Sequence, residues 1–163
     1  FLSEVLDFRY VPLEVLLRRS DIVSLHLPYL PSTRHLMNRA AFRLMKRGAL
    51  LINTARGGLV ETGALVWALD EGIVGGAGLD VLEGEELVKE ERQLLSKDFP
   101  KEKLATALRN HILLHRENVV ITPHIAFDSR EALQRILETT VQNITGFLSH
   151  TPTNVVAGAA RSA

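Results

Sequence analysis

The chain has 163 residues, of which 46% are hydrophobic and 23% charged, a composition typical of a globular protein with one sizeable core. Its 19 Lys and Arg residues balance 19 Asp and Glu residues, which argues against a nucleic-acid-binding protein because such proteins carry a clustered basic excess. The sequence has no cysteine, no apolar run long enough to span a bilayer and no signal-peptide pattern, so we expect a cytoplasmic protein without disulfides or a membrane partner.

Short apolar runs alternate with helical patterns along the sequence, which is typical of βαβ units around a parallel sheet. The predicted strands are Phe8–Val11, Asp21–Leu27, Ala49–Thr54, Ala77–Val81 and Val119–Thr122. The predicted helices are Leu13–Arg19, His35–Lys46, Gly63–Glu71 and Ser129–Leu148. Gly48 and Gly72 are expected to end the helices that precede them. This order of elements predicts the α/β class.

The stretch between Val81 and Asn118 is rich in charged residues. Four of its residues are spaced as one helical face, namely Leu104, Leu108, Ile112 and His115. We predict a solvated surface insertion that contains one short packed helix. A cap over an active-site cleft is the alternative, and the sequence leaves both open.

Three residues with catalytic potential follow predicted strands. Arg56 follows the strand Ala49–Thr54, and Glu85 and His124 follow the next two strands. In parallel α/β sheets, ligands bind outside the carboxyl ends of the strands. An arginine there can hold a carboxylate with two hydrogen bonds, a histidine can exchange a proton near neutral pH, and a glutamate beside it favours the imidazolium.

Each of these residues also has an ordinary structural explanation. Arg56 could pair with a surface acid, Glu85 could be a solvated member of a charged run, and His124 could be structural. Their common placement after parallel strands favours the catalytic interpretation. Among the other histidines, His26 is predicted in the core or a cleft wall, and the surface is predicted for His35, His111, His115 and His150. No H-E-x-x-H motif is present, and we predict no metal site.

Four ordered segments of the sequence resemble the D-isomer-specific 2-hydroxyacid dehydrogenases. They are SDIVSLHLP at 20–28, LMKRGALLINTARGG at 44–58, GLDV at 78–81 and TPH at 122–124. The resemblance extends over most of the chain, from about Phe8 to Val156. It implies a partial Rossmann-type domain, a doubly wound parallel sheet with helices on both faces, over residues 1–150, followed by a partly disordered tail at 151–163.

The resemblance also implies the activity and the site. The activity is hydride transfer between NAD and C2 of a small D-2-hydroxy acid or 2-oxo acid. The arginine matching Arg56 binds the substrate's carboxylate and carbonyl, and the glutamate matching Glu85 supports the histidine matching His124, the acid/base. Contacts with NAD are implied for Leu27, Pro28, Thr33, Thr54, Ala55, Arg56, Asp80 and His124.

Two departures from the family pattern bear on this expectation. The Gly-x-Gly-x-x-Gly loop that binds the cofactor phosphates is not found, so we expect a fragment that lacks the first two strands and is inactive alone. The segment between Glu85 and His124 is long, and PHIAF at 123–127 is similar to the D-lactate dehydrogenase branch. This favours a small apolar 2-oxo acid, and the intact enzyme is expected to be a homodimer.

The main alternative is a regulatory protein of the same fold, like the C-terminal binding protein corepressors, in which NAD gates assembly. That group keeps the residues matching Arg56, Glu85 and His124, so the motifs do not distinguish the two. A formate dehydrogenase is disfavoured, because that branch has Gln at the position of Glu85.

Overall fold

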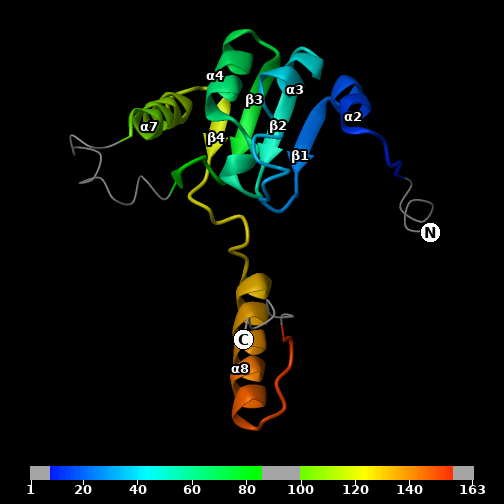
Figure 1. Ribbon diagram of the computed structural model, residues 1–163, viewed down its shortest axis with the longest axis vertical. Helices are drawn as coiled ribbons and strands as arrows, with labels where there is room; N and C mark the ends of the chain where they lie inside the picture. Colours follow the sequence, from blue (N-terminus) through cyan, green and yellow to red (C-terminus); the bar gives the residue numbers. More distant parts are fainter. Residues whose placement is uncertain (1–7, 86–99, 156–163) are drawn as a thin grey trace, which may run out of the picture. The chain divides into compact units, whose positions relative to one another are not determined.

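The computed structural model describes residues 8–85 and 100–155. By its internal contacts the chain divides into two compact units, Phe1–His124 and Ile125–Ala163. The first unit contains a parallel sheet with its helices, and the second contains one long helix (Figure 1).

The sheet of the first unit has four parallel strands arranged in sequence order. They are β1 (Ile22–Leu25), β2 (Ala49–Asn53), β3 (Val74–Leu79) and β4 (Val119–Ile121). Val23 pairs with Leu51, Leu51 with Ala77, and Ala77 with Val119. Because all four strands run in one direction, their carboxyl ends meet at one edge of the sheet, where proteins of this class bind ligands.

Helices follow the strands in the alternating order that the sequence predicts. They are α2 (Leu13–Arg19), α3 (Arg39–Leu44), the 3-10 turn η1 (Gly57–Leu59), α4 (Thr62–Asp70) and α7 (Lys101–Leu114). The Asn38 side chain caps α3 by accepting hydrogen bonds from the N–H groups of Ala40 and Ala41 at 3.0 and 3.1 Å. Gly72, with a φ of 65°, ends α4 as expected.

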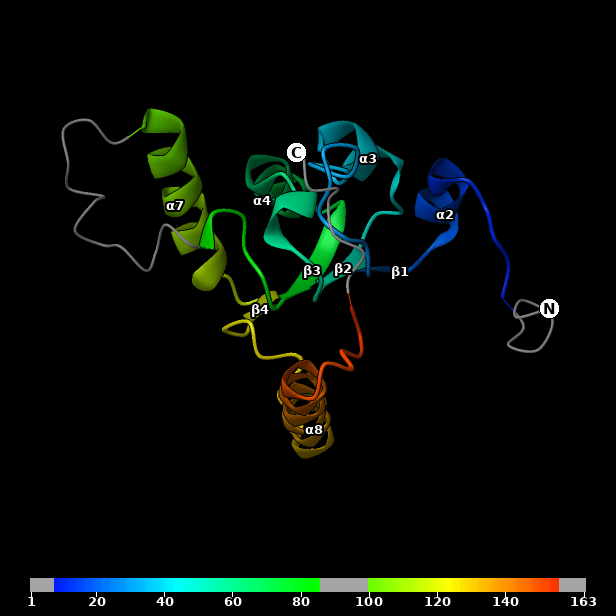
Figure 2. The ribbon, with the colours of Figure 1, turned by 60° about the horizontal axis from the view of Figure 1, so that its bottom comes forward.

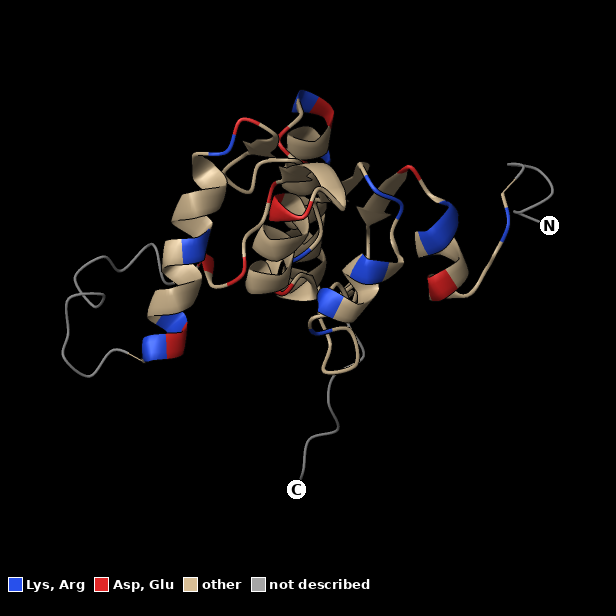
Figure 3. Cartoon of the chain, turned by 90° about the horizontal axis from the view of Figure 1, so that it is seen from above, with Lys and Arg blue, Asp and Glu red and all other residues tan. Residues whose placement is uncertain are grey.

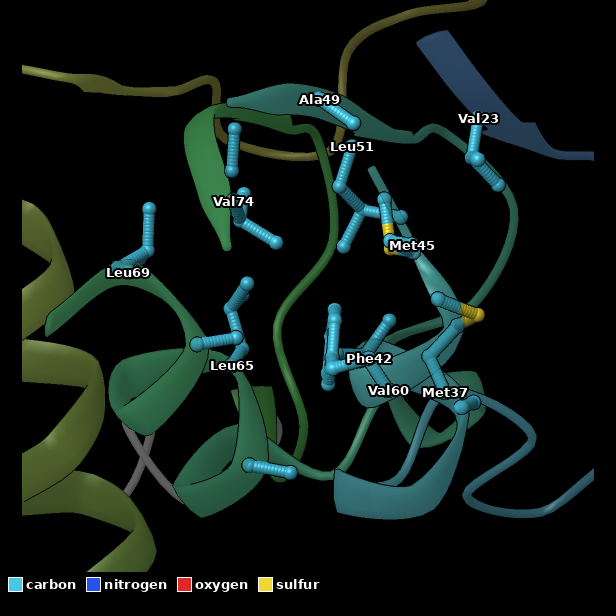
Figure 4. Packing of buried hydrophobic residues seen from close by; sticks show 14 of the residues in the cluster. Val23, Met37, Phe42, Met45, Ala49, Leu51, Val60, Leu65, Leu69 and Val74 are labelled. Carbon is cyan, nitrogen blue, oxygen red and sulfur yellow. The ribbon is translucent and has the colours of Figure 1, made fainter. Parts of the chain in front are cut away.

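The hydrophobic core lies between these helices and one face of the sheet. In both ribbon views α2, α3 and α4 lie on the same side of the strands (Figures 1 and 2), and α7 packs against α4 and β4. Figure 4 shows strand residues packed against residues from α3, α4 and the segments beside them, among them Val23, Leu51, Val74, Met37, Phe42, Val60 and Leu65. Each fully buried side chain of this size contributes about 1.5–3 kcal/mol.

The other face of the sheet is open within this unit. Ile22, Leu50 and Val120 point away from the core and are 59%, 40% and 67% exposed. The parallel α/β architecture is as predicted, and within this unit the helices cover one of the two faces that were expected to carry them.

Two predicted elements near the beginning of the described chain differ from the structure. Phe8–Val11 does not form a strand, because a strand requires a hydrogen-bonded neighbour and none of the described strands pairs with it. The helix predicted to begin at His35 begins at Arg39, since the preceding residues form a turn in which His35 has a φ of 50°. Gly48 lies beyond the end of α3 and leads into β2 with a φ of 79°.

Strand β3 begins three residues earlier than predicted, at Val74, and therefore includes Gly75 and Gly76. A Cβ atom at Gly75 would lie 2.6 Å from the carbonyl oxygen of Gly48, and one at Gly76 would lie 3.0 Å from that of Asn118. The glycines therefore allow neighbouring backbone segments to approach closely, and a glycine-rich run is here a tightly packed strand.

The helix predicted in the charged stretch exists as α7, but it packs through a different face. Leu104, Leu108 and Ile112 are 40%, 59% and 47% exposed, whereas Asn110 and Leu113 are buried. The predicted packing face was therefore wrong. Hydrogen bonding of Asn110 and burial of Leu113 against the core decide which side of the helix faces inward.

The second unit consists of α8 (Arg130–Leu148) and the segment that follows it. The Ser129 side chain caps the helix by accepting a hydrogen bond from Ala132 N–H at 3.2 Å. Beyond the helix, Thr151 N–H donates to Gly146 O at 2.8 Å and Asn154 Nδ2 donates to Asn143 Oδ1 at 2.9 Å. Most of the tail expected to be disordered lies outside the described residues.

Charge and hydropathy along the helices bear on possible partners. Both signs of charge occur on α2 and on α7 (Figure 3), so neither helix presents a surface of one sign. Among the helices of residues 8–85 and 100–155, none combines the length and the hydropathy needed to cross a bilayer.

Candidate active site

The structure brings Glu85 and His124 together at the carboxyl edge of the sheet. Glu85 follows β3 and His124 follows β4, and Glu85 Oε1 lies 2.7 Å from His124 Nδ1. The backbone N–H of His124 donates to Asp80 O at 2.9 Å, and His124 has a φ of 58°. Residues other than glycine rarely adopt this left-handed backbone conformation, and those that do cluster at functional sites.

This arrangement has a direct chemical consequence for the imidazole. A carboxylate can only accept a hydrogen bond, so His124 Nδ1 carries the proton in the contact with Glu85. Nε2 is then the nitrogen available to give or take a proton from another molecule. The His124 side chain remains 45% exposed and the Glu85 side chain 35% exposed, so a ligand can reach both.

Arg56 lies in a loop that a buried amide closes. Asn53, the last residue of β2, is 1% exposed. Its Nδ2 donates to Arg56 O at 3.0 Å, and its Oδ1 accepts from Ala55 N–H at 3.1 Å. The Arg56 guanidinium donates to Ala55 O at 2.6 Å through Nη1 and retains further donors for a ligand. Asn53 was missed by the sequence analysis, although a polar residue ending a buried strand is a usable signal.

The Arg56 loop (residues 53–58) and the Glu85 turn (residues 81–85) are in backbone contact. A Cβ atom at Gly57 would lie 2.1 Å from the carbonyl carbon of Leu82, so only glycine fits there. A cavity of about 730 Å³ adjoins both segments and includes Arg56 and Glu85 in its wall. The structure therefore places two of the three predicted catalytic residues on one cavity, and Glu85 contacts the third.

A second cavity of about 620 Å³ lies at the carboxyl ends of β1 and β2. Its wall is formed by His26, Leu27, Pro28, Tyr29, Thr54, Ala55 and Arg56. Five of the eight residues expected to contact NAD are therefore grouped around one cavity. Polar and apolar groups share its wall about equally, with Arg56 at one side, which suits the nicotinamide ring and its carboxamide. The cofactor phosphates need N–H groups at a helix N-terminus.

Two other residues that are expected to contact NAD, Thr33 and Asp80, also make hydrogen bonds within the chain. Thr33 Oγ1 donates to Pro28 O at 2.8 Å and accepts from Leu30 N–H at 2.8 Å, so it shapes the turn after β1. Asp80 is 4% exposed, and its carboxylate accepts a hydrogen bond from Thr122 Oγ1. Asp80 thereby ties the end of β3 to the end of β4, close to His124.

One acidic residue near the site was not singled out from the sequence. Glu83 forms an ion pair with His35, in which Oε1 lies 2.5 Å from Nε2. Burial raises the pKa of the Glu83 carboxyl, but hydrogen bonds from Thr62 N–H and Oγ1 and the nearby His35 lower it more, so the net pKa lies below its ordinary value. His35, predicted at the surface, is partly covered in this contact: its side chain is 29% exposed and borders the cavity.

The remaining histidines show no metal centre. Within the part of the chain that the structure describes, no group of three or more His, Asp or Glu side chains is arranged to hold an ion. His26 bonds to Ser24 Oγ at 2.8 Å in a cavity wall. His111 and His115 are exposed one turn apart on α7, with ring centroids 4.4 Å apart.

Comparison with known proteins supplies an independent reference for this site. Residues 3–126 match the profile of the NAD-binding domain of D-isomer-specific 2-hydroxyacid dehydrogenases. The chain is 43% identical over 145 residues to the D-specific alpha-keto acid dehydrogenase of Enterococcus faecalis, covering 89% of this chain and 43% of that protein. It is 39% identical over 146 residues to the glycerate dehydrogenase of Methylorubrum extorquens, covering 90% of this chain and 41% of that protein.

The solved structures to which this fold is similar include D-2-hydroxyacid dehydrogenases. The D-lactate dehydrogenase of Aquifex aeolicus, complexed with NAD and lactic acid, superimposes with a TM-score of 0.76 at 40% identity, covering 88% of this chain and 41% of that one. For D-2-hydroxyisocaproate dehydrogenase the TM-score is 0.79 at 36% identity, with 93% and 44% covered. The chain thus spans less than half the length of each of these proteins.

Proposed function

Because the chain belongs to the D-isomer-specific 2-hydroxyacid dehydrogenases, as the resemblance predicted, and matches their NAD-binding domain over residues 3–126, we propose that it supplies the acid/base and substrate-anchoring residues of such an enzyme. The reaction is hydride transfer between NAD and C2 of a small 2-hydroxy or 2-oxo acid. The contact between Glu85 Oε1 and His124 Nδ1 at 2.7 Å carries the proposal, and Arg56 borders the same cavity as Glu85.

In this proposal Arg56 binds and orients the acid. A guanidinium presents paired donors that match the two oxygens of a carboxylate, and such charge-assisted bonds are stronger than neutral ones. Asn53 restrains the backbone of the loop through the carbonyl of Arg56. The orientation of the arginine then depends on a buried amide that does not titrate.

His124 moves the proton. During reduction of a 2-oxo acid, protonated His124 gives its Nε2 proton to the C2 oxygen, and during oxidation neutral His124 takes it back. The Glu85 carboxylate holds the imidazole in this orientation by accepting the proton of Nδ1. NAD, when bound, supplies or accepts the hydride. The residues around the cavity at β1 and β2, Leu27, Pro28, Thr54, Ala55 and Arg56, would hold its nicotinamide end.

The activity is proposed for a protein that contains this chain together with a phosphate-binding loop and a substrate domain. Two further expectations, a homodimer and a cytoplasmic location, belong to the same proposal. The similarity of this chain to the D-lactate dehydrogenases and to D-2-hydroxyisocaproate dehydrogenase supports a small apolar 2-oxo acid as the substrate class.

A hybrid enzyme tests the function. In the alpha-keto acid dehydrogenase of Enterococcus faecalis, the 145 matched residues are replaced by this chain, and oxidation of NADH is measured with pyruvate, glyoxylate and longer 2-oxo acids. We expect reduction of at least one acid, with His124→Ala lowering turnover by about 100- to 10,000-fold while NADH binding persists. A folded hybrid that reduces none of the acids contradicts the proposal, and NADH binding without turnover favours the regulatory alternative.

A further inference from the structure

Glu83 is an acidic residue near the site with several side-chain hydrogen bonds, and the proposed reaction does not use it. Oε2 accepts hydrogen bonds from Thr62 N–H at 3.0 Å and from Thr62 Oγ1 at 2.8 Å, and Oε1 lies 2.5 Å from His35 Nε2. The carbonyl oxygen of Glu83 accepts from Asn110 Nδ2 at 2.9 Å. One residue therefore joins the turn after β1, the first turn of α4 and the middle of α7.

These contacts restrain the Glu85 turn (residues 81–85). Gly84 separates the two glutamates with a φ of 69°, a conformation suited to glycine in a tight turn. Within the turn, Glu85 N–H donates to Leu82 O at 3.2 Å, and Leu82 N–H donates to Glu85 Oε2 at 3.3 Å. The same carboxylate that contacts His124 is thus folded back onto the segment that Glu83 anchors.

His35 extends this restraint to the Arg56 loop. Its side chain pairs with Glu83, and its backbone N–H donates to Gly58 O at 2.9 Å. Gly57 in the same loop packs directly on the backbone of Leu82. The two segments that present Arg56 and Glu85 are therefore connected by an ion pair as well as by backbone packing.

The charge on Glu83 is well supported where it lies. The pKa of its carboxyl is lowered by the hydrogen bonds from Thr62 and by His35 in spite of burial. The N-terminal end of α4 also carries the positive end of the helix dipole, which stabilises a negative charge there. An anionic Glu83 thus persists through the pH range in which a histidine exchanges protons.

We propose that Glu83 is a positioning residue, which holds the Glu85 turn so that the Glu85 carboxylate meets His124 Nδ1. The inference rests on the proposed function of Glu85 and His124 as an acid/base pair. Glu83 itself bonds to the turn after β1, to α4 and to α7, whereas His124 follows β4, so Glu83 acts on His124 through Glu85. A purely structural role for Glu83 would lower stability and leave the Glu85–His124 hydrogen bond intact in the folded protein.

The test is an NMR measurement of the Glu85–His124 hydrogen bond in the 163-residue chain. Neutral histidine carries its proton on one of two ring nitrogens, and the hydrogen bond that the ring makes selects which. A long-range ¹H–¹⁵N spectrum of the ¹⁵N-labelled chain at about pH 9, above the ordinary range of histidine, reports the tautomer of His124. The His124 signals are assigned by their loss in His124→Gln.

Three variants give the comparison. Glu85→Ala removes the partner of His124 and defines the spectrum without the contact. Glu83→Ala tests the proposal, and Glu61→Ala is the matched control, because Glu61 borders the same cavity and its side chain makes no capping hydrogen bond to α4. Circular dichroism establishes that each variant is folded, and if Glu83→Ala is not, Glu83→Gln is measured in its place.

We expect Glu83→Ala to move the His124 Nδ1 resonance most of the way toward its position in Glu85→Ala, with Glu61→Ala leaving it unchanged. A folded Glu83 variant with the wild-type His124 spectrum overturns the positioning role. If Glu85→Ala itself leaves the His124 spectrum unchanged, the acid/base pair is wrong and the proposed function fails with it. The two failures are therefore distinguishable in one set of spectra.

Discussion

The Arg56 loop and the Glu85 turn lie against each other, yet different chemistry holds each in place. A neutral amide closes the loop, because both polar ends of the buried Asn53 side chain bond to its backbone. A charged carboxylate anchors the turn, because Glu83 bonds to Thr62 and pairs with His35. The amide does not titrate, whereas the Glu83 carboxylate does, with a lowered pKa. The restraint on the Arg56 loop should therefore be independent of pH, and the restraint on the Glu85 turn should weaken only in acid, where Glu83 becomes protonated.

Among the changes that test this comparison between loop and turn, Arg56→Ala in the hybrid enzyme is expected to have the largest effect. Two charge-assisted hydrogen bonds to the substrate carboxylate would be lost, worth about 3–4 kcal/mol together, or roughly 100- to 1000-fold in kcat/KM. We expect this loss to be similar at every pH tested, which steady-state kinetics between about pH 6 and pH 9 would show. A loss of kcat/KM confined to one end of the pH range would contradict the assignment of Arg56 as a substrate anchor whose action is independent of pH.

Replacement of Gly57 should disturb both segments at once. In Gly57→Ala the new Cβ would overlap the Leu82 backbone, and overpacking of this kind costs about 1–3 kcal/mol. Chemical denaturation of the chain measures the cost. Gly63→Ala is the control, because a Cβ there meets only the Arg109 side chain at 3.2 Å, and alanine favours a helix. Equal stability of the two variants would show that the contact between loop and turn is loose.

Glu85→Gln should slow 2-oxo acid reduction in the hybrid enzyme. The Glu85 carboxylate accepts the Nδ1 proton of His124, and its replacement by an amide removes a charge-assisted hydrogen bond worth about 1.5 kcal/mol, or roughly tenfold in kcat/KM. Glu61→Gln, which removes a charge from the same cavity wall, should leave kcat/KM unchanged. An unchanged kcat/KM in Glu85→Gln would remove Glu85 from the acid/base pair.

The smallest effect concerns the acid dependence of stability. Because the pKa of Glu83 is lowered in the folded chain, its contribution is complete above the pKa of the unfolded state, about 4–5, and disappears as the pH falls through the lowered value. Glu83→Gln should therefore flatten the acid side of the curve of unfolding free energy against pH. Asn53→Ala should lower that curve by a similar amount at every pH. Urea unfolding between about pH 3 and pH 7 compares the two, and parallel curves for Glu83→Gln and the wild-type chain would contradict the assigned charge.

Local sequence signals predicted most of the fold and the placement of the candidate catalytic residues. Strands β1, β2 and β4 and helices α2, α4 and α8 lie where periodicity and capping residues indicate them. The three candidates Arg56, Glu85 and His124 follow strands, and parallel strands end at one edge whatever their side chains are. The family was likewise readable from four short ordered motifs.

Tertiary structure decided the features that depend on contacts between distant residues. His35 and Glu83 are 48 positions apart, and no local pattern distinguishes this glutamate from its charged neighbours. The inward face of α7 is set by Asn110 and Leu113, although the stripe of Leu104, Leu108 and Ile112 is the more apolar. Periodicity reports where a helix is amphipathic, but the packing of the core and the hydrogen bonds of buried polar groups determine which side is covered.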